Sequence, residues 1–156
     1  MPVERLRKFL DENHVKYLTV KHSQAFSAQE VADSAHIPGR EVAKTVMVKL
    51  DGRMAMVVLP APEMIDLEGL RAATGSQTAE LATEKEFSGL FPKCETGAMP
   101  PFGNLWDMPV FVDQHLREDE IIAFSAGSHT EIVQMTYSDF ERLVKPTVLE
   151  FAESRI

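Results

Sequence analysis

The sequence predicts one α/β or α+β domain in which helices pack on a mixed β-sheet. Amphipathic helical segments alternate along the chain with short apolar strands, and a strong hairpin turn at Asp51-Gly52 joins two of these strands. No internal repeat, linker or composition break divides residues 1–156, so we expect a single domain. Because hairpins join antiparallel strands, an all-parallel doubly wound sheet is not expected.

The first part of the chain predicts a helix, a strand and a second helix. Apolar residues recur at helical spacing over residues 2–13, and residues 17–20 form a short apolar strand. Ser27-Ala28-Gln29-Glu30 has the form of a capping box, in which Ser27 accepts from the helix start and Glu30 reaches back. The helix that it opens is expected to stop before Pro38-Gly39.

The clearest local signal is the hairpin in the middle of the chain. Apolar strands are expected at residues 42–50 and 53–59, on either side of the Asp51-Gly52 turn. Asp66 is a candidate cap for a following helix, which should end at Gly75.

The C-terminal half predicts two further helices and three strands. Thr83-Glu84-Lys85-Glu86 is a second capping box and opens a short helix toward Leu90. Thr136 caps the last helix, which Pro146 ends. Strands are expected at residues 110–112, 121–124 and 131–135.

Composition and charge narrow the class of protein. The net charge of −8 argues against tight, sequence-independent binding to a nucleic-acid backbone, although it leaves a local basic patch open. Cys94 is the only cysteine, so no internal disulfide forms, and we expect a bystander thiol. No segment approaches the ~20 apolar residues of a membrane span, and the N-terminus lacks an apolar signal region. A soluble cytoplasmic protein is expected.

Several kinds of chemistry lack their sequence signatures. Neither glycine-rich nucleotide-phosphate motif is present, and the five histidines show no paired metal-ligand spacing. Ser128 and His129 are neighbours in sequence, and strand neighbours point to opposite faces, which is weak evidence for a nucleophile pair. Most of the carboxylates lie at helix starts and on exposed helix faces, where capping explains them.

One lysine stands out, because it lies within an apolar strand. Lys44 is surrounded by the run Val42 to Val48, and a buried ammonium is costly unless it finds a partner. Residues 97–103 and 126–130 are glycine-bearing segments that could complete a pocket for a small, oxygen-rich or anionic ligand. The alternative is that Lys44 lies at a sheet edge and extends to water.

Together these three segments, in this order, resemble the YbaK/prolyl-tRNA synthetase-associated domain family over essentially the whole chain. The resemblance rests on Ala43-Lys44-Thr45-Val46, on Gly97 to Gly103 and on Ser125 to His129. It implies a twisted mixed sheet wrapped by helices, and a free-standing deacylase that hydrolyses mischarged aminoacyl-tRNA. The histidine and the Pro-Phe-Gly loop look more like the synthetase insertion and the alanyl-tRNA(Pro) deacylases than the cysteinyl-tRNA deacylases. Alanine-specific members often have asparagine where this chain has Thr45.

The resemblance also assigns roles to residues. The residues expected to be catalytic are Lys44, Gly127, Ser128 and His129. Those expected to bind substrate are His22, Thr45, Gly97, Met99, Pro100, Pro101, Phe102, Gly103 and Ala126. The family resemblance implies no metal and no cofactor. Its implied partners are the acceptor end of a tRNA and a tRNA synthetase, with no membrane.

The expected mechanism is attack of a positioned water on an activated ester, aided by stabilisation of the oxyanion. Backbone N–H groups of residues 127–129 and 97–103 would polarise the carbonyl, and Lys44 would hold the terminal phosphate or ribose. His129 would orient substrate or water. Bulky Met99, Pro101 and Phe102 suggest a small cavity that suits alanine. A candidate basic fringe for the tRNA consists of Lys21, Arg40, Lys44, Lys49 and Arg53. For all of these except Lys44, an ordinary solvated face is an equally good interpretation.

Two other functions stay open on the sequence alone. The first is a non-catalytic binding module that uses the same pocket for a nucleotide, an aminoacyl-adenylate-like ligand or a partner protein. The second is a hydrolase of small free esters, which would not need the tRNA body.

Overall fold

The computed structural model describes residues 3–25 and 27–154. The helices in this part of the chain are α1 (Glu4–Glu12), α2 (Ala28–Ala35), α3 (Leu67–Thr74), α4 (Glu84–Phe87) and α5 (Tyr137–Val144). The strands are β1 (Leu18–Lys21), β2 (Ala43–Leu50), β3 (Arg53–Pro60), β4 (Glu63–Ile65), β5 (Ala79–Leu81), β6 (Val110–Asp113), β7 (Ile121–Ser125), β8 (Glu131–Thr136), β9 (Thr147–Leu149) and β10 (Ala152–Ser154). Short 3₁₀ turns lie at Gly39–Glu41, Gly103–Trp106 and Leu116–Glu118.

The described strands form a mixed five-stranded sheet, in the order β5-β2-β3-β6-β9, and two smaller sheets. Pairing is antiparallel from β5 to β3 and parallel from β3 to β9. The smaller sheets are β1-β8-β7 and β10-β4, both antiparallel. A single parallel bridge between Val42 and Ala123 connects β7 to the start of β2. The predicted mixed sheet is therefore confirmed, but it does not include every strand.

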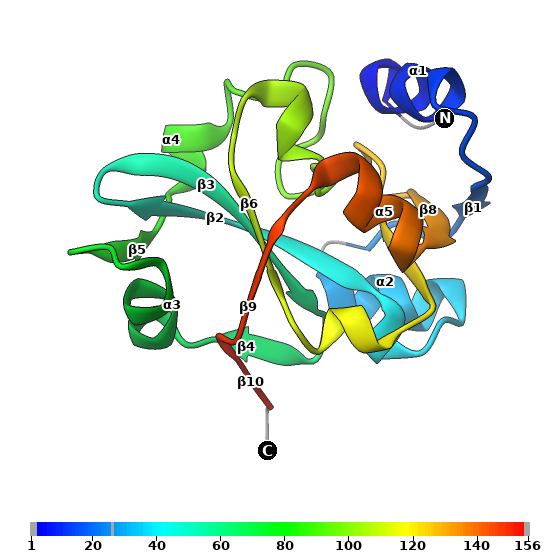
Figure 1. The fold of residues 1–156 in the computed structure, drawn as a ribbon. Helices are drawn as coiled ribbons and strands as arrows, with labels where there is room; N and C mark the ends of the chain where they lie inside the picture. Colours follow the sequence, from blue (N-terminus) through cyan, green and yellow to red (C-terminus); the bar gives the residue numbers. More distant parts are fainter. Residues whose placement is uncertain (1–2, 26, 155–156) are drawn as a thin grey trace.

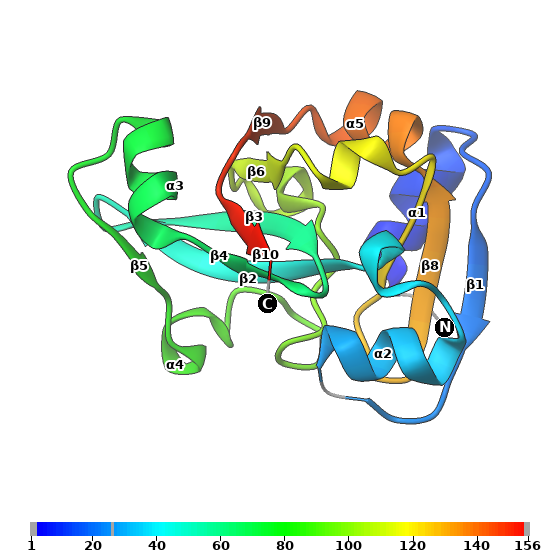
Figure 2. The same ribbon diagram turned by 90° about the horizontal axis from the view of Figure 1, so that it is seen from below.

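The β2–β3 hairpin is the axis of the fold (Figure 1). Asp51 and Gly52 both have positive φ, as a two-residue hairpin turn requires. The strands pair in full register from Ala43 with Pro60 to Leu50 with Arg53. In both views α3 and β5 lie toward the turn, whereas α1, α2, β1 and β8 lie toward the opposite end of the hairpin (Figures 1 and 2).

Both faces of the five-stranded sheet are buried, which explains why residues 55–60 read as an unbroken apolar run. On one face, Met56 and Val58 pack into the main core beneath α1 and α5. On the other, Val57 and Leu59 pack with Leu70 of α3 and Phe151. A smaller cluster around Val31, Ala123 and Ile132 seats α2 on the three-stranded sheet.

The predicted helix starts are mostly confirmed. The Thr83 capping box is complete, and the Ser27 and Thr136 hydroxyls accept from the amides of Glu30 and Asp139. The helix after Thr83 is shorter than predicted and ends at Phe87. Asp66 occupies the N-cap position of α3 but makes no side-chain capping bond, so that part of the prediction is wrong.

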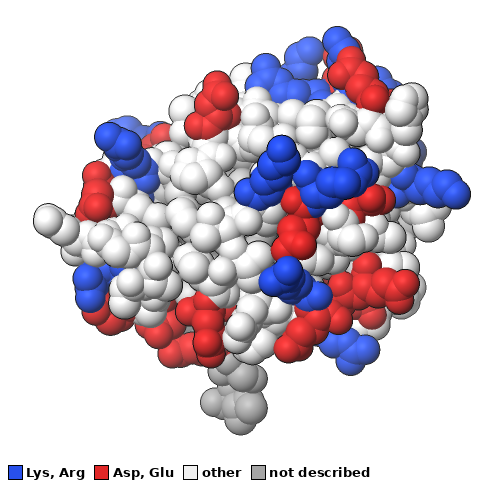
Figure 3. Space-filling model, in the orientation of Figure 1, with Lys and Arg blue, Asp and Glu red and all other residues white. Residues whose placement is uncertain are grey.

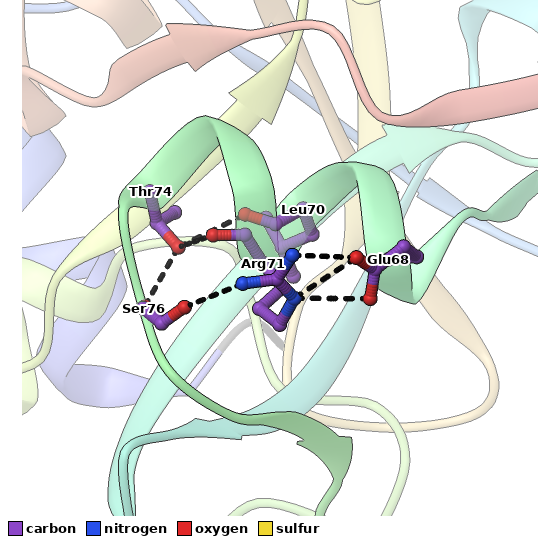
Figure 4. A network of polar contacts seen from close by, with 5 residues as sticks. All are labelled: Glu68, Leu70, Arg71, Thr74 and Ser76. Carbon is purple, nitrogen blue, oxygen red and sulfur yellow. Dashed lines mark hydrogen bonds and ion pairs between the residues drawn. The ribbon is translucent and has the colours of Figure 1, made fainter.

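Helix α3 is held at its far end by a side-chain network instead (Figure 4). The Arg71 guanidinium bonds Glu68 one turn earlier and also donates to the Ser76 carbonyl at 3.1 Å. The Thr74 hydroxyl donates to the Leu70 carbonyl at 2.9 Å and lies 2.7 Å from the Ser76 hydroxyl. These contacts tie the last turn of α3 to the residues that follow it. None of the described helices has the length and apolarity needed to span a bilayer.

Candidate functional site

Lys44 lies on the wall of a cavity of about 180 Å³, which holds roughly six water volumes. The cavity forms where the first residues of β2, the loop at residues 97–99 and the end of β7 meet. The lining residues are Ala25, Ser27, Val31, Val42, Ala43, Lys44, Thr45, Val46, Gly97, Met99, Ser125 and His129.

The lining is mostly apolar, with a few convergent polar groups. Lys44 is half-buried, and its backbone is fixed by pairing opposite Leu59 in the hairpin. Hydroxyl groups come from Ser27, Thr45 and Ser125. Among the described residues that line the cavity none is acidic, and the Lys44 side chain contributes a cationic group to the wall. This arrangement suits an anionic or oxygen-rich ligand.

His129 is buried and is tied to the neighbouring loop. Its Nε2 lies 2.9 Å from the Thr96 carbonyl oxygen, and its backbone N–H donates to Glu95 Oε2 at 3.3 Å. Because a carbonyl oxygen can only accept, Nε2 carries a proton, and in the neutral ring Nδ1 is the acceptor. The imidazole therefore both supports backbone groups, as a turn residue would, and lines the cavity.

Gly97 brings this loop against the imidazole. Its φ of +89° lies in the region that favours glycine, and its N–H points to the Met99 sulfur at 3.2 Å. Met99 is almost fully buried and limits the cavity on the same side. Gly97 therefore lies against the His129 ring, and the bulky Met99 side chain lines the same cavity.

Four residues predicted to bind substrate lie outside the cavity lining, in the packed interior. Phe102 is fully buried and packs against the rings of Phe9, Phe124 and Phe140. Pro100 and Pro101 are buried beside it. Ala126 is fully buried in the same core. The structure thus places these four residues in the core and not on the cavity wall, and their contact with substrate stays a prediction.

Gly103 is also a packing residue. A Cβ at this position would lie 2.6 Å from Val110 Cγ2 and 2.7 Å from the Met108 carbonyl oxygen. These close contacts leave no room for a side chain at position 103, so they explain the glycine without any contact to a ligand.

The turn at residues 127–129 donates most of its amides within the protein. The Gly127 N–H donates to the Ala98 carbonyl at 2.9 Å, and the His129 N–H donates to Glu95. The Ser128 hydroxyl lies 3.3 Å from the Thr130 hydroxyl, and neither Gly127 nor Ser128 lines the cavity. The expected oxyanion hole made of these amides is therefore wrong for Gly127.

His22 lies outside the lining too. Its backbone N–H donates to the Thr130 carbonyl at 2.8 Å, and its Nδ1 lies 2.7 Å from the Ser23 carbonyl oxygen. Its Nε2 is buried and has no hydrogen-bond partner within the described residues. His22 thus borders the turn that carries His129, without reaching the cavity.

The predicted basic fringe is not assembled around Lys44. Arg53 lies at the hairpin turn, roughly 20 Å along the strand from Lys44. Lys49 forms ion pairs with Glu86 and Glu80, and Arg40 lies 3.8 Å from Asp119. On the face shown in Figure 3, Lys and Arg are interspersed with Asp and Glu.

Cys94 behaves as the sequence predicted. Burial raises the pKa of its thiol to about 11, and the nearby Arg5 charge offsets only part of this shift. At neutral pH the thiol is protonated, so it is a poor nucleophile. The sequence did not single out Ser27 or Ser125 as site residues, although Ser125 lies directly before the Ala126-Gly127 pair that drew attention to this turn.

Solved structures share this fold. The crystal structure of hypothetical protein APE2540 superposes with a TM-score of 0.85 at 16% identity, covering 96% of this chain and 100% of that one. The crystal structure of a candidate trans-editing enzyme for prolyl tRNA synthetase superposes with a TM-score of 0.81 at 18% identity, covering 96% of both chains.

Sequence relatives agree with the predicted family. The chain is 27% identical over 154 residues to the Escherichia coli (strain K12) protein named multifunctional Ser/Thr-tRNA deacylase ProXp-y, covering 95% of this chain and 91% of that one. It is 26% identical over 142 residues to the prolyl-tRNA editing protein ProX of Acetoanaerobium sticklandii, covering 87% and 86%. The model of the aminoacyl-tRNA editing domain matches residues 22–143, which include Lys44, the 97–103 loop and His129. The chain therefore belongs to the aminoacyl-tRNA editing domain family.

Proposed function

We propose that this chain is a trans-editing hydrolase, which cleaves the ester bond of mischarged aminoacyl-tRNA. The observation that carries this proposal is the placement of Lys44 and His129 on one small cavity without a carboxylate among its described lining residues. The family and the names of the two relatives support the same activity.

The chemistry needs no strong nucleophile, because an aminoacyl ester is already activated. A positioned water and stabilisation of the developing negative charge can supply much of the rate enhancement for hydrolysis of the ester. The Gly127 amide is engaged elsewhere, so we assign charge stabilisation to the Lys44 ammonium, which also holds the terminal phosphate or ribose. The His129 ring orients substrate or water, and a terminal ribose hydroxyl helps to deliver the water.

The cavity suits a small amino-acid side chain such as alanine. Its volume of about 180 Å³ leaves little room beside the ester, and Met99 limits it further. The hydroxyls of Thr45 and Ser125 can also pair with a β-hydroxyl group, so serine and threonine fit the same space. Rejection of one methylene by fit is worth only ~1–3 kcal/mol, so selectivity among small side chains is modest.

The proposed partner is the acceptor end of a tRNA, and a tRNA synthetase is a second proposed partner. Residues 1–156 would act as one domain in the cytoplasm. The family and the presence of Lys44 on the cavity wall favour this function over a non-catalytic binding module, which would not require a lysine there.

The test is hydrolysis of a panel of aminoacyl-tRNA(Pro) species charged with alanine, serine, threonine, cysteine or proline. The wild type should deacylate at least one small mischarged species and spare Pro-tRNA(Pro). Lys44→Ala should reduce that rate severely with its circular dichroism unchanged, whereas the matched control Lys85→Ala, at an exposed site on α4, should keep it. Turnover by Lys44→Ala at the wild-type rate would contradict the proposed role of Lys44. Absence of turnover on any species would favour a binding module.

A further inference from the structure

Three potential metal ligands from separate parts of the chain converge beside a second, larger cavity. Glu63 begins β4, Asp113 ends β6, and His115 follows two residues later. One ligand atom from each residue lies within 4.8 Å of the other two. This cluster was not predicted from the sequence, because Glu63 is distant along the chain and His115 has no histidine at metal-ligand spacing.

One of the two interatomic distances around His115 Nδ1 matches that of ligands that share one ion, and the other is shorter. His115 Nδ1 lies 2.7 Å from Glu63 Oε1 and 3.2 Å from Asp113 Oδ2. Two ligands about 2.1 Å from a metal ion, at angles of about 90–110°, lie about 3.0–3.4 Å apart. His115 Nδ1 is nonetheless buried without a hydrogen bond of proper geometry among the described residues, and so is Glu63 Oε2. The three ligand atoms are thus close enough to share one ion once the Glu63 carboxylate moves slightly away from His115.

Asp113 is held in place as a ligating carboxylate usually is. It is fully buried, and its Oδ1 accepts the backbone N–H groups of Phe151 and Ala152 at 2.9 and 2.8 Å. Its Oδ2 accepts the His115 N–H at 2.9 Å and retains a second lone pair toward the cluster. Such outer hydrogen bonds fix the orientation of metal ligands. An ion here would connect β4, β6 and the segment that leads into β10.

The adjacent cavity supplies a route of entry and space for water ligands. It measures about 550 Å³, and Glu63 and His115 are both on its wall. Glu118 and Asp119 add negative charge to the same wall, and Arg40, 3.8 Å from Asp119, adds one positive charge. With Glu63 the wall keeps an acidic excess, which favours entry of a cation. No residue lines both this cavity and the Lys44 cavity, so the two are separate sites among the described residues.

We propose that Glu63, Asp113 and His115 bind a divalent transition-metal ion, with water from the cavity in the remaining coordination positions. One imidazole and two carboxylates suit Zn²⁺ and related first-row ions, whereas Mg²⁺ and Ca²⁺ prefer all-oxygen sites. The bound ion stabilises the packing of the C-terminal segment on β4 and β6. This site goes beyond the proposed deacylation and is independent of it.

The test is a titration of the chelator-treated full chain with Zn²⁺, and in parallel with Mg²⁺, by calorimetry. Glu63→Gln and His115→Asn remove one ligand each and leave Asp113, with its backbone bonds, intact. His14→Asn is the matched control, because His14 is exposed and has a positive φ that asparagine tolerates. The ¹⁵N shift of His115 Nδ1 identifies the ligand atom.

The wild type and His14→Asn should bind one Zn²⁺ with the same affinity, and both ligand variants should bind at least about 10-fold more weakly. His115 Nδ1 should shift on addition of Zn²⁺, and the unfolding temperature should rise only in proteins that keep all three ligands. The proposal is wrong if Zn²⁺ affinity is unchanged in both ligand variants, if Mg²⁺ binds as tightly as Zn²⁺, or if no Zn²⁺ binds. In the last case the cluster is an ion pair around a protonated His115.

Discussion

Gly97 and His129 meet on the wall of the Lys44 cavity, where a Cβ added to Gly97 would lie 3.6 Å from His129 Cε1. That distance is an ordinary van der Waals contact, so space alone does not require glycine. The φ of +89° does, because an L side chain in this conformation is strained. The Gly97 backbone thus lies against the imidazole, whose Nε2 is also 2.9 Å from the carbonyl oxygen of the preceding residue, Thr96.

Gly97→Ala should destabilise the protein by about 1–2 kcal/mol, through backbone strain, and should lower deacylation as the loop moves relative to His129. Urea denaturation and single-turnover deacylation measure the two effects. Gly89→Ala is the control, because a Cβ there meets nothing within 4 Å and its φ is not in the positive region. Equal stability of the two variants would show that the loop relaxes without cost.

Phe102→Ala should act on stability and not on substrate recognition. The ring is fully buried among three other aromatic rings, so its removal should cost about 3–5 kcal/mol. Measured well below its lowered unfolding temperature, the variant should retain the KM of the wild type. A large rise in KM with unchanged stability would instead show that Phe102 takes part in substrate binding.

Met99→Ala should change substrate recognition, because this side chain lines the cavity. The enlarged space should raise kcat/KM for a bulkier aminoacyl group relative to alanyl by about 10-fold, within the ~1–3 kcal/mol available from fit. Competition between two aminoacyl-tRNAs charged on the same tRNA gives the ratio directly. An unchanged ratio would mean that Met99 does not limit the substrate.

Cys94 should be chemically inert in the folded protein. With a pKa of about 11, only about 0.1% of the thiol is ionised at pH 8, so alkylation by iodoacetamide should be slow until urea unfolds the chain. Cys94→Ala should deacylate at the wild-type rate. Rapid alkylation of the native protein, with loss of activity, would contradict this expectation.

The ion pair of Lys49 and Glu86 should make stability depend on acid pH. The hydrogen bond from Lys49 lowers the pKa of Glu86 from 4.5 to about 2, so its contribution is complete above pH 4.5 and is lost as pH falls toward 2. Glu86→Gln keeps the capping-box geometry and removes the charge. The difference in urea midpoint between wild type and variant should be present at pH 6 and should shrink between pH 4.5 and 2. A difference in urea midpoint that stays constant over this range would show that the Glu86 charge contributes nothing. Glu12→Gln is the control for the loss of one surface carboxylate.

Local signals predicted the fold well where a few adjacent residues decide the structure. The Asp51-Gly52 turn and the Thr83 capping box are of this kind, since each satisfies its own backbone geometry. The three-residue strands β4, β5, β9 and β10 were not predicted, because their hydrogen bonds depend on partners far along the chain. Asp66 shows that the right residue at a helix start need not form the capping bond.

The sequence motifs also predicted part of the cavity lining. Lys44, Thr45, Gly97, Met99 and His129 line the cavity as the motifs suggested. Phe102 and Ala126 belong to the same motifs but point into the core, and a motif does not reveal which of its residues face a cavity. The cluster around Asp113 arises only when β4 and β6 are brought together in three dimensions.

The five-stranded sheet ends at both edges in very short strands, since β5 and β9 have three residues each. β5 also carries the exposed Glu80, which is paired with Lys49 of β2. A second copy approaching either edge would find few backbone groups free to extend the ladder, and at β5 it would have to bury a charge. The apolar hairpin at the centre of the molecule is thereby protected from strand addition between chains, which favours resistance to amyloid-like aggregation.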